Sequence, residues 1–233
     1  MQFLEKTTNF LKETLFPIFC LGCNVEGEWI CDKCRFSFDT NGIFLCPVCK
    51  THTVFGKVCD NCKNKTDISS VSAVFNFKKN PNIVNLIHLW KYQYAEELTE
   101  KVDDFVQEFT RSNFSLFLDV NAIVPIPLHP RRFAERGFNQ AEKIAQSLSQ
   151  VLEKPVLNLL KRKRYTKQQA KLSKFKRGKN VGGAFVLSKD FQKFKRVLLV
   201  DDVYTTGSTM GECARVLRSG GVQIVDSFVL VRG

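Results

Sequence analysis

The chain has 233 residues and a formal net charge of +12, with 35 Lys and Arg against 23 Asp and Glu. This length suits one ordinary α/β domain with a small additional unit. No apolar run approaches the roughly 20 residues that a membrane-spanning helix needs, and no secretory signal is visible. The composition therefore excludes an integral membrane protein, and we expect a cytoplasmic one.

Eight of the nine cysteines form four CxxC pairs. The pairs are Cys20 with Cys23, Cys31 with Cys34, Cys46 with Cys49, and Cys59 with Cys62. Each pair presents two thiolates on one tight turn, and a tetrahedral zinc ion takes two such turns, so the spacing predicts two structural zinc sites. Disulfides are disfavoured without an export signal, and a redox motif uses one CxxC rather than four. Neighbouring pairs close each site at the least loop entropy, although interleaved pairing stays open.

The composition changes near Thr66, from Cys, Gly and Asn to the alternating pattern VSAVFNF at 71–77. We therefore predict a boundary between an N-terminal helix with a cysteine zinc-binding domain at 1–66 and a second domain at 67–233. The first holds too few apolar residues for a core of its own. Metal binding would then supply its folding free energy.

Strands and helices alternate along the second domain. The hydrophobic periodicity predicts strands at 71–77, 121–126, 196–201 and 223–231, and helices at 81–92, 95–111, 138–153 and 208–219. Such alternation is typical of an α/β fold with a mostly parallel sheet and helices on its faces.

A segment rich in proline and arginine, VPIPLHPRRFAERGFNQAE at 124–142, follows the strand at 121–126. Its prolines stiffen the turn, and Arg131, Arg132 and Arg136 offer forked donors that suit phosphate oxygens. Taken alone, arginines in such a loop usually lie on the surface. His129 could act as a base, although no partner for it is visible.

The segment KRKRYTKQQAKLSKFKRGKN at 161–180 holds ten basic residues and no acid. A run with one sign of charge usually meets polyanions. The anion is either the pyrophosphate of a small ligand or the backbone of a nucleic acid, and charge alone does not discriminate. For single-stranded DNA we expect Lys174, Lys176 and Arg177 to bind phosphates, with Tyr165 and Phe175 stacking on bases.

The segment VLLVDDVYTTGST at 197–209 carries the strongest functional signal. An apolar strand ends in Asp201 and Asp202, and ligands of parallel α/β sheets bind just beyond the carboxyl ends of strands. Two carboxylates would repel a phosphate unless they bind the hydroxyls of the sugar that carries it, so the pattern indicates a ribose 5-phosphate. An Asp-Asp pair can also cap a helix or lie in a solvated turn, but here strand, acids and turn occur together. The turn suits a phosphate through its hydroxyls, its glycine and the helix start; its residues are Thr205, Thr206, Gly207, Ser208 and Thr209.

This segment resembles the phosphoribosyl pyrophosphate (PRPP) loop of type I phosphoribosyltransferases at nearly every position, Tyr204 being the less usual one. The resemblance implies that Asp201 and Asp202 hold the ribose hydroxyls of PRPP, which binds with Mg²⁺, and that residues 205–209 surround its 5-phosphate. The segment at 124–142 is similar in position to that family's pyrophosphate loop. The pyrophosphate would then meet Arg131, Arg132 and Arg136, joined by Arg177 from a loop that closes over the ligand.

The features together are similar to the ComF family: an N-terminal CxxC zinc domain, the RGFNQ segment at 136–140 and the loop at 197–209. The family's pattern between them also matches, at Arg164, Gln168, Leu172, Arg177, Asn180 and Phe185. The resemblance implies a type I phosphoribosyltransferase fold with an N-terminal double zinc ribbon. It also implies a protein that binds PRPP and handles single-stranded DNA in natural transformation, with a ComFA-like helicase as a partner.

Two other functions stay open at this point. The chain could be an active phosphoribosyltransferase of the amidophosphoribosyltransferase-like kind in nucleotide metabolism, or a scaffold whose zinc domain docks a partner. No acceptor pocket and no paired acid and base are visible, so catalytic residues and acceptor stay unassigned.

Overall fold

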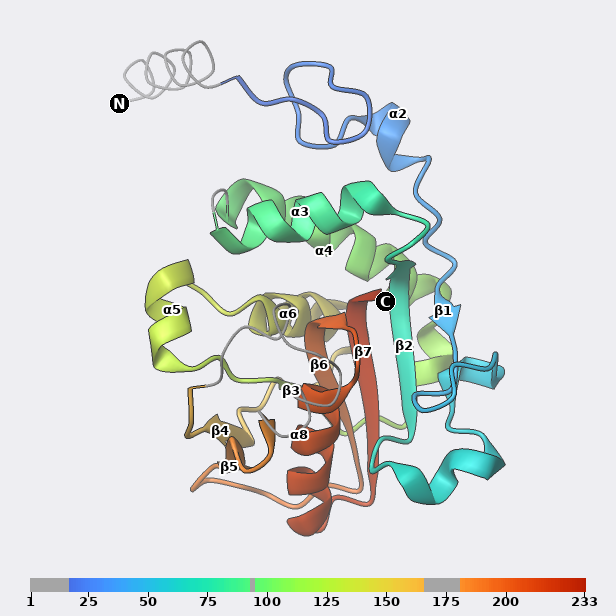
Figure 1. The fold of residues 1–233 in the computed structure, drawn as a ribbon, viewed down its shortest axis with the longest axis vertical. Coiled ribbons are helices and arrows are strands. Elements are labelled where there is room, and N and C mark those ends of the chain that lie inside the picture. Colours follow the sequence, from blue (N-terminus) through green and yellow to red (C-terminus); the bar gives the residue numbers. More distant parts are fainter. Residues whose placement is uncertain (1–16, 93–94, 166–180) are drawn as a thin grey trace.

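The computed structural model describes residues 17–92, 95–165 and 181–233. Its centre is a five-stranded sheet in the order β1-β2-β7-β6-β3 (Figure 1). The strands are β1 (Ile43–Phe44), β2 (Ser70–Asn76), β3 (Ala122–Pro125), β6 (Arg196–Tyr204) and β7 (Ile224–Arg232). Neighbouring strands are parallel except β1, which pairs with β2 in the antiparallel sense. The predicted α/β fold with a mostly parallel sheet is confirmed.

Helices cover both faces of this sheet, which is why its central strands are mostly apolar. On one face lie α3 (Pro81–Tyr92), α4 (Ala95–Ser112) and α6 (Gln140–Leu152), and α8 (Ser208–Ser219) lies on the other (Figure 1). Side chains of a strand alternate between these layers. On β6, Leu198 packs toward α4 and α6, whereas Leu199 packs toward α8.

Three local features differ from the expectations. A short helix, α5 (Pro130–Arg136), replaces the expected turn. It begins with Pro130, which suits a first helical position, and His129 Nδ1 caps it by accepting a hydrogen bond from the Arg131 N–H at 3.2 Å. Gly137 ends the helix with a left-handed φ of 79°. A small antiparallel pair, β4 (Leu160–Arg162) and β5 (Phe185–Leu187), flanks the basic stretch.

The third difference concerns β6, which continues beyond the two aspartates instead of ending at them. Val203 and Tyr204 pair in register with Val231 and Arg232 of β7. The acidic residues are therefore held by the sheet itself, and the turn that follows starts only after Tyr204.

The cysteine-rich segment contains α2 (Asp32–Arg35) and the 3-10 turns η1 (Val54–Gly56) and η2 (Asp60–Lys65). A further 3-10 turn, η3 (Phe114–Phe117), follows α4. Ile30 of this segment is buried in the same cluster as β2 and α4, and Phe38 meets Phe75 edge-on at 6.0 Å between ring centroids. The boundary near residue 66 stays a prediction. Within the described ranges, no helix is long and apolar enough to cross a membrane.

Candidate ligand site and metal centres

Asp201 and Asp202 lie near the carboxyl end of β6, the edge at which the neighbouring parallel strands also end. Asp202 is buried and forms an ion pair with Lys91, the penultimate residue of α3. The backbone N–H of Asp202 donates a hydrogen bond to Asp201 Oδ1 at 2.9 Å. The sheet therefore presents two fixed carboxyl groups directly before the turn that opens α8.

The two carboxyl groups differ in charge. Burial and then the negative charge of Asp202 raise the pKa of Asp201 to about 8. Burial also opposes ionisation of Asp202, but the ammonium group of Lys91 outweighs it and lowers the pKa of that carboxyl. At neutral pH the pair thus carries one proton and one negative charge. A neutral carboxyl beside a carboxylate offers both a donor and acceptors, which suits the hydroxyl groups of a sugar.

The turn after β6 has the geometry that a phosphate requires. Gly207 caps α8 with a left-handed φ of 74°, and a Cβ added there would lie 2.2 Å from the hydroxyl oxygen of Tyr204, so a side chain has no room. Thr206 Oγ1 and Ser208 Oγ are 2.9 Å apart and face the same turn. The first N–H groups of α8 add donors for an anion.

Arg136, at the end of α5, is tied to two other elements. Its guanidinium donates to Gln140 Oε1 at 3.1 Å and to the hydroxyl oxygen of Tyr92 at 3.3 Å. Its charge also helps to lower the pKa of Asp202, after the larger effect of Lys91. The structure therefore brings this predicted pyrophosphate residue to the same end of the sheet as the acidic pair.

Arg131 and Arg132, also on α5, lie against an aromatic side chain. Their guanidinium carbons are 5.2 and 6.0 Å from the centroid of the Tyr165 ring. His129 meets the same ring edge-on at 5.2 Å. The predicted loop residue Arg177 and the predicted DNA-binding residues Lys174 and Lys176 lie outside the described residues, as do Phe175 and the predicted N-terminal helix.

Sequence reasoning missed two charged residues of this site, Lys91 and Arg162. Arg162, on β4, stacks over Phe185 at 5.1 Å, and its pKa is lowered by burial and then by the charge of Arg132. The carboxylate of Asp201 acts on it in the opposite direction. Lys91 stood out only as a cation at the end of an amphipathic helix, and Arg162 was one of ten basic residues in its segment.

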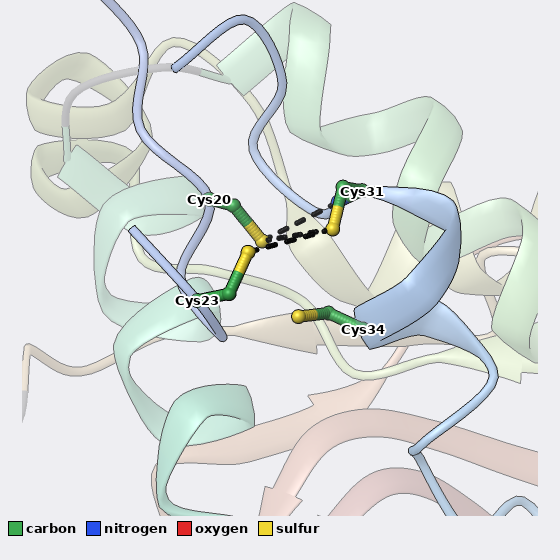
Figure 2. A group of neighbouring side chains, drawn as sticks. All are labelled: Cys20, Cys23, Cys31 and Cys34. Carbon is green, nitrogen blue, oxygen red and sulfur yellow. Dashed lines mark hydrogen bonds between the residues drawn. The ribbon is translucent and has the colours of Figure 1, made fainter. Parts of the chain in front are cut away.

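The first four cysteines form one cluster, which Figure 2 shows. The Sγ atoms of Cys20, Cys23, Cys31 and Cys34 all lie within 4.8 Å of one another. Cys31 Sγ is 3.7 Å from Cys20 Sγ and 3.6 Å from Cys23 Sγ. Tetrahedral Zn–S bonds of about 2.3 Å place sulfurs about 3.8 Å apart. The N–H groups of Gly22 and Cys31 both donate to Cys20 Sγ at 3.4 Å, which stabilises a thiolate.

The other four cysteines, Cys46, Cys49, Cys59 and Cys62, form a second cluster of the same kind. Cys49 Sγ and Cys59 Sγ are 3.6 Å apart. A hydrogen bond with Cys49 and then burial raise the pKa of Cys59 to about 12. A cation would offset the repulsion among four thiolates, and both clusters are compatible with structural zinc. The structure groups neighbouring CxxC pairs, as the loop entropy favoured.

Known proteins similar to this chain agree with these features. A family model for the phosphoribosyl transferase domain matches residues 134–233, which include the acidic pair and the turn after β6. The chain is 44% identical to Competence protein F of Haemophilus influenzae over 114 residues, 48% of this chain and half (50%) of that protein. It is 26% identical to Competence protein ComFC of Bacillus subtilis over 216 residues, 88% of this chain and 85% of that protein.

The similarity to a third relative extends over nearly the whole chain. DNA utilization protein YhgH of Escherichia coli is 30% identical over 225 residues, which cover 93% of this chain and 97% of that protein. The domain match also agrees with the parallel sheet and the position of the acidic pair. The chain therefore belongs to the ComF family, with a type I phosphoribosyltransferase fold and a cysteine-rich N-terminal region.

Proposed function

We propose that this protein is a cytoplasmic ComF-type protein that binds PRPP with Mg²⁺ and handles single-stranded DNA during DNA uptake. The observation that carries PRPP binding is the acidic pair on β6, with Asp202 held by Lys91, directly before the glycine-capped turn. Relatives named for competence and DNA utilization support the role in DNA uptake.

In the proposed complex the ribose hydroxyls bind Asp201 and Asp202, and the 5-phosphate binds residues 205–209. The pyrophosphate lies toward Arg136, with Arg131, Arg132 and Arg177 completing its surroundings. Mg²⁺ bound with PRPP would neutralise part of the charge on the pyrophosphate. The described residues fit such a ligand because only Asp202 of the acidic pair is charged at neutral pH, whereas the guanidinium groups of Arg132, Arg136 and Arg162 lie nearby.

Tyr165 supports the proposal for single-stranded DNA. Tyr165 is 39% exposed, and His129, Arg131 and Arg132 lie around its ring. An exposed ring beside cations suits base stacking together with phosphate binding. Lys174, Lys176 and Arg177 would extend this surface along the basic segment, and a ComFA-like helicase would supply the strand.

Calorimetry with Mg-PRPP tests the small-molecule site. We expect the wild-type protein to bind, and Asp201→Ala and Asp202→Ala to lose at least about tenfold in affinity, because each removes the oxygen atoms that bind the ribose hydroxyls, worth about 1.4 kcal/mol or more. Asp119→Ala, at an exposed carboxylate on the opposite edge of the sheet, is the matched control and should bind as wild type. An absence of binding by the wild-type protein would contradict the proposal. Release of pyrophosphate would instead favour the active transferase of nucleotide metabolism.

Fluorescence anisotropy of labelled single-stranded DNA over a range of salt concentrations tests the second part. Replacing Lys174, Lys176 and Arg177 together by Gln should reduce the salt slope by about 2, since each phosphate contact on a single strand contributes about 0.7. Tyr165→Ala should weaken binding at every salt concentration by about 1 to 3 kcal/mol. An unchanged slope would exclude the basic segment as the DNA surface.

A further inference from the structure

Tyr204, the residue that departs from the usual PRPP loop, connects that loop to the cysteine-rich region. It is the last residue of β6 and only 4% exposed. Its hydroxyl donates a hydrogen bond to the carbonyl oxygen of Pro47 at 3.1 Å. Pro47 lies between Cys46 and Cys49, so the hydroxyl binds the backbone of the second metal cluster directly.

Arg232, the last residue of β7, makes the same connection from the neighbouring strand. It pairs in register with Tyr204 and is 3% exposed. Its Nη1 donates to the carbonyl oxygen of Leu45 at 2.7 Å, and its Nη2 donates to that of Cys46 at 2.8 Å. The guanidinium also lies over the Tyr204 ring, 5.1 Å from its centroid. Three successive carbonyl groups, from residues 45 to 47, are thus bound by the ends of two central strands.

The same tyrosine ring also packs against the turn after β6, residues 205–209, which we call the phosphate turn. A Cβ at Gly207 would lie within 2.2 Å of the Tyr204 hydroxyl oxygen and 2.6 Å of the ring carbon that carries it. The backbone of the turn therefore rests on the end of the ring that bonds to Pro47. A displacement of the backbone at residues 45–47 would move the ring and, with it, the turn.

We propose that the metal at the second cluster positions the phosphate turn through Tyr204 and Arg232, so that metal retention and sugar-phosphate binding are coupled. This inference rests on the proposed binding of PRPP. Tyr204 and Arg232 are positioning residues, because they act on the turn and not on the ligand. The segment of the first cluster is instead tied to α4, with Trp29 Nε1 bound to Glu97 at 2.8 Å and Arg35 paired with Glu108 at 3.0 Å.

Two exposed cysteines, one from each cluster, give a matched pair of variants. Cys49→Ser opens the second cluster and Cys23→Ser opens the first, and metal analysis should show about one zinc lost in each case. We expect Cys49→Ser to weaken Mg-PRPP binding at least about tenfold and to speed amide hydrogen exchange in residues 205–210. Cys23→Ser should leave both properties within about twofold of wild type. Equal effects of the two variants, or no effect of Cys49→Ser, would overturn the inference.

Tyr204→Phe removes the hydrogen bond to Pro47 and keeps the ring beneath the turn. We expect this variant to retain both zinc ions and to show faster amide hydrogen exchange in residues 205–210. Adding Cys49→Ser to it should speed that exchange less than Cys49→Ser does in the wild-type protein, as coupled sites require. Additive effects would refute the connection. Because coupling between two binding sites is reciprocal, PRPP should slow the loss of zinc from the wild-type protein to a chelator. The same addition should slow zinc loss from Tyr204→Phe by a smaller factor.

The exchange measurement separates the two proposals. If the wild-type protein fails to bind PRPP, the proposed function is wrong. Hydrogen exchange in residues 205–210 after loss of the second zinc still decides whether that cluster positions the turn.

Discussion

Asp201 and Asp202 are adjacent on β6, and their carboxyl groups interact with each other but have different further neighbours. Asp202 faces the layer of α3, where Lys91 pairs with it. Asp201 faces the layer of α8 and β4, and its carboxylate acts on the pKa of Cys213 and of Arg162. The difference between their pKa values follows from these neighbours, because the ammonium group of Lys91 pairs with Asp202.

Asp201→Asn should reveal that difference as a change in stability with pH. The pKa of Asp201 is about 8 in the folded protein against a usual 3.8, so between these values the folded state keeps a proton that the unfolded state loses. Ionisation of the Asp201 carboxyl therefore lowers the free energy of unfolding as the pH rises. The advantage of Asp201→Asn over wild type should therefore grow from about pH 5 to about pH 8, by at least about 1 kcal/mol or about 2 to 4 °C in Tm. Thermal scans of Asp190→Asn, an exposed carboxylate, are the control, and a constant difference for Asp201→Asn would refute the assignment.

The segments around the two cysteine clusters depend most on metal for their folded structure. The segment of residues 20–35 has one short helix of four residues, α2, and no buried residue within that helix. Its turns are instead organised around sulfur, as Gly22 shows, where a Cβ would lie 2.5 Å from Cys34 Sγ. The backbone hydrogen bonds of this segment lie within its turns, and the sulfur cluster joins these turns, so metal binding supplies much of its folding free energy.

Metal removal should therefore loosen this segment while the sheet persists. Trp29 lies in the segment and binds Glu97, whereas Trp90 of α3 is fully buried in the core and binds Thr99 of α4. We expect a strong zinc chelator to release two zinc ions per chain and to shift the emission of Trp29 to the red, with far-UV circular dichroism largely kept. Trp29→Phe should abolish the shift. A shift that persists in Trp29→Phe would mean that the core around Trp90 opens too.

At the scale of the whole molecule, the cysteine-rich region and the sheet share one hydrophobic core. Phe38 lies edge-on to both Phe75 and Phe105, at 6.0 and 5.4 Å, and Ile30 is 1% exposed in the same cluster. Strand β1 also extends the sheet past β2. The chain on either side of residue 66 therefore packs into one core, and the boundary there stays a prediction.

Residues 67–233 expressed alone should fold with reduced stability. Burial of Ile30 alone stabilises the intact chain by about 1.5 to 3 kcal/mol, which corresponds to several degrees in Tm. We expect a lower Tm and binding of a hydrophobic dye at the exposed face of Phe75 and Phe105. A fragment with the Tm of the intact chain would show that the two units are independent.

Local patterns in the chain were sufficient for much of this protein. The period of apolar residues predicted the helices and strands of the parallel sheet, and the CxxC spacing predicted the two clusters of four cysteines. The order of strand, acids and turn also predicts a ligand site, which stays a proposal, and the structure has Gly207 at the left-handed position of that turn. These features are readable because backbone geometry and metal coordination act over a few neighbouring residues.

Contacts between distant segments were decided only by the tertiary structure. Lys91 reaches Asp202 across more than one hundred positions, and Tyr204 reaches Pro47 across 157. Arg162 meets the site because β4 and β5 pair around the basic segment. No local pattern predicts such partners, because packing of the layers selects which of many similar cations and carbonyl groups comes within reach of a given side chain.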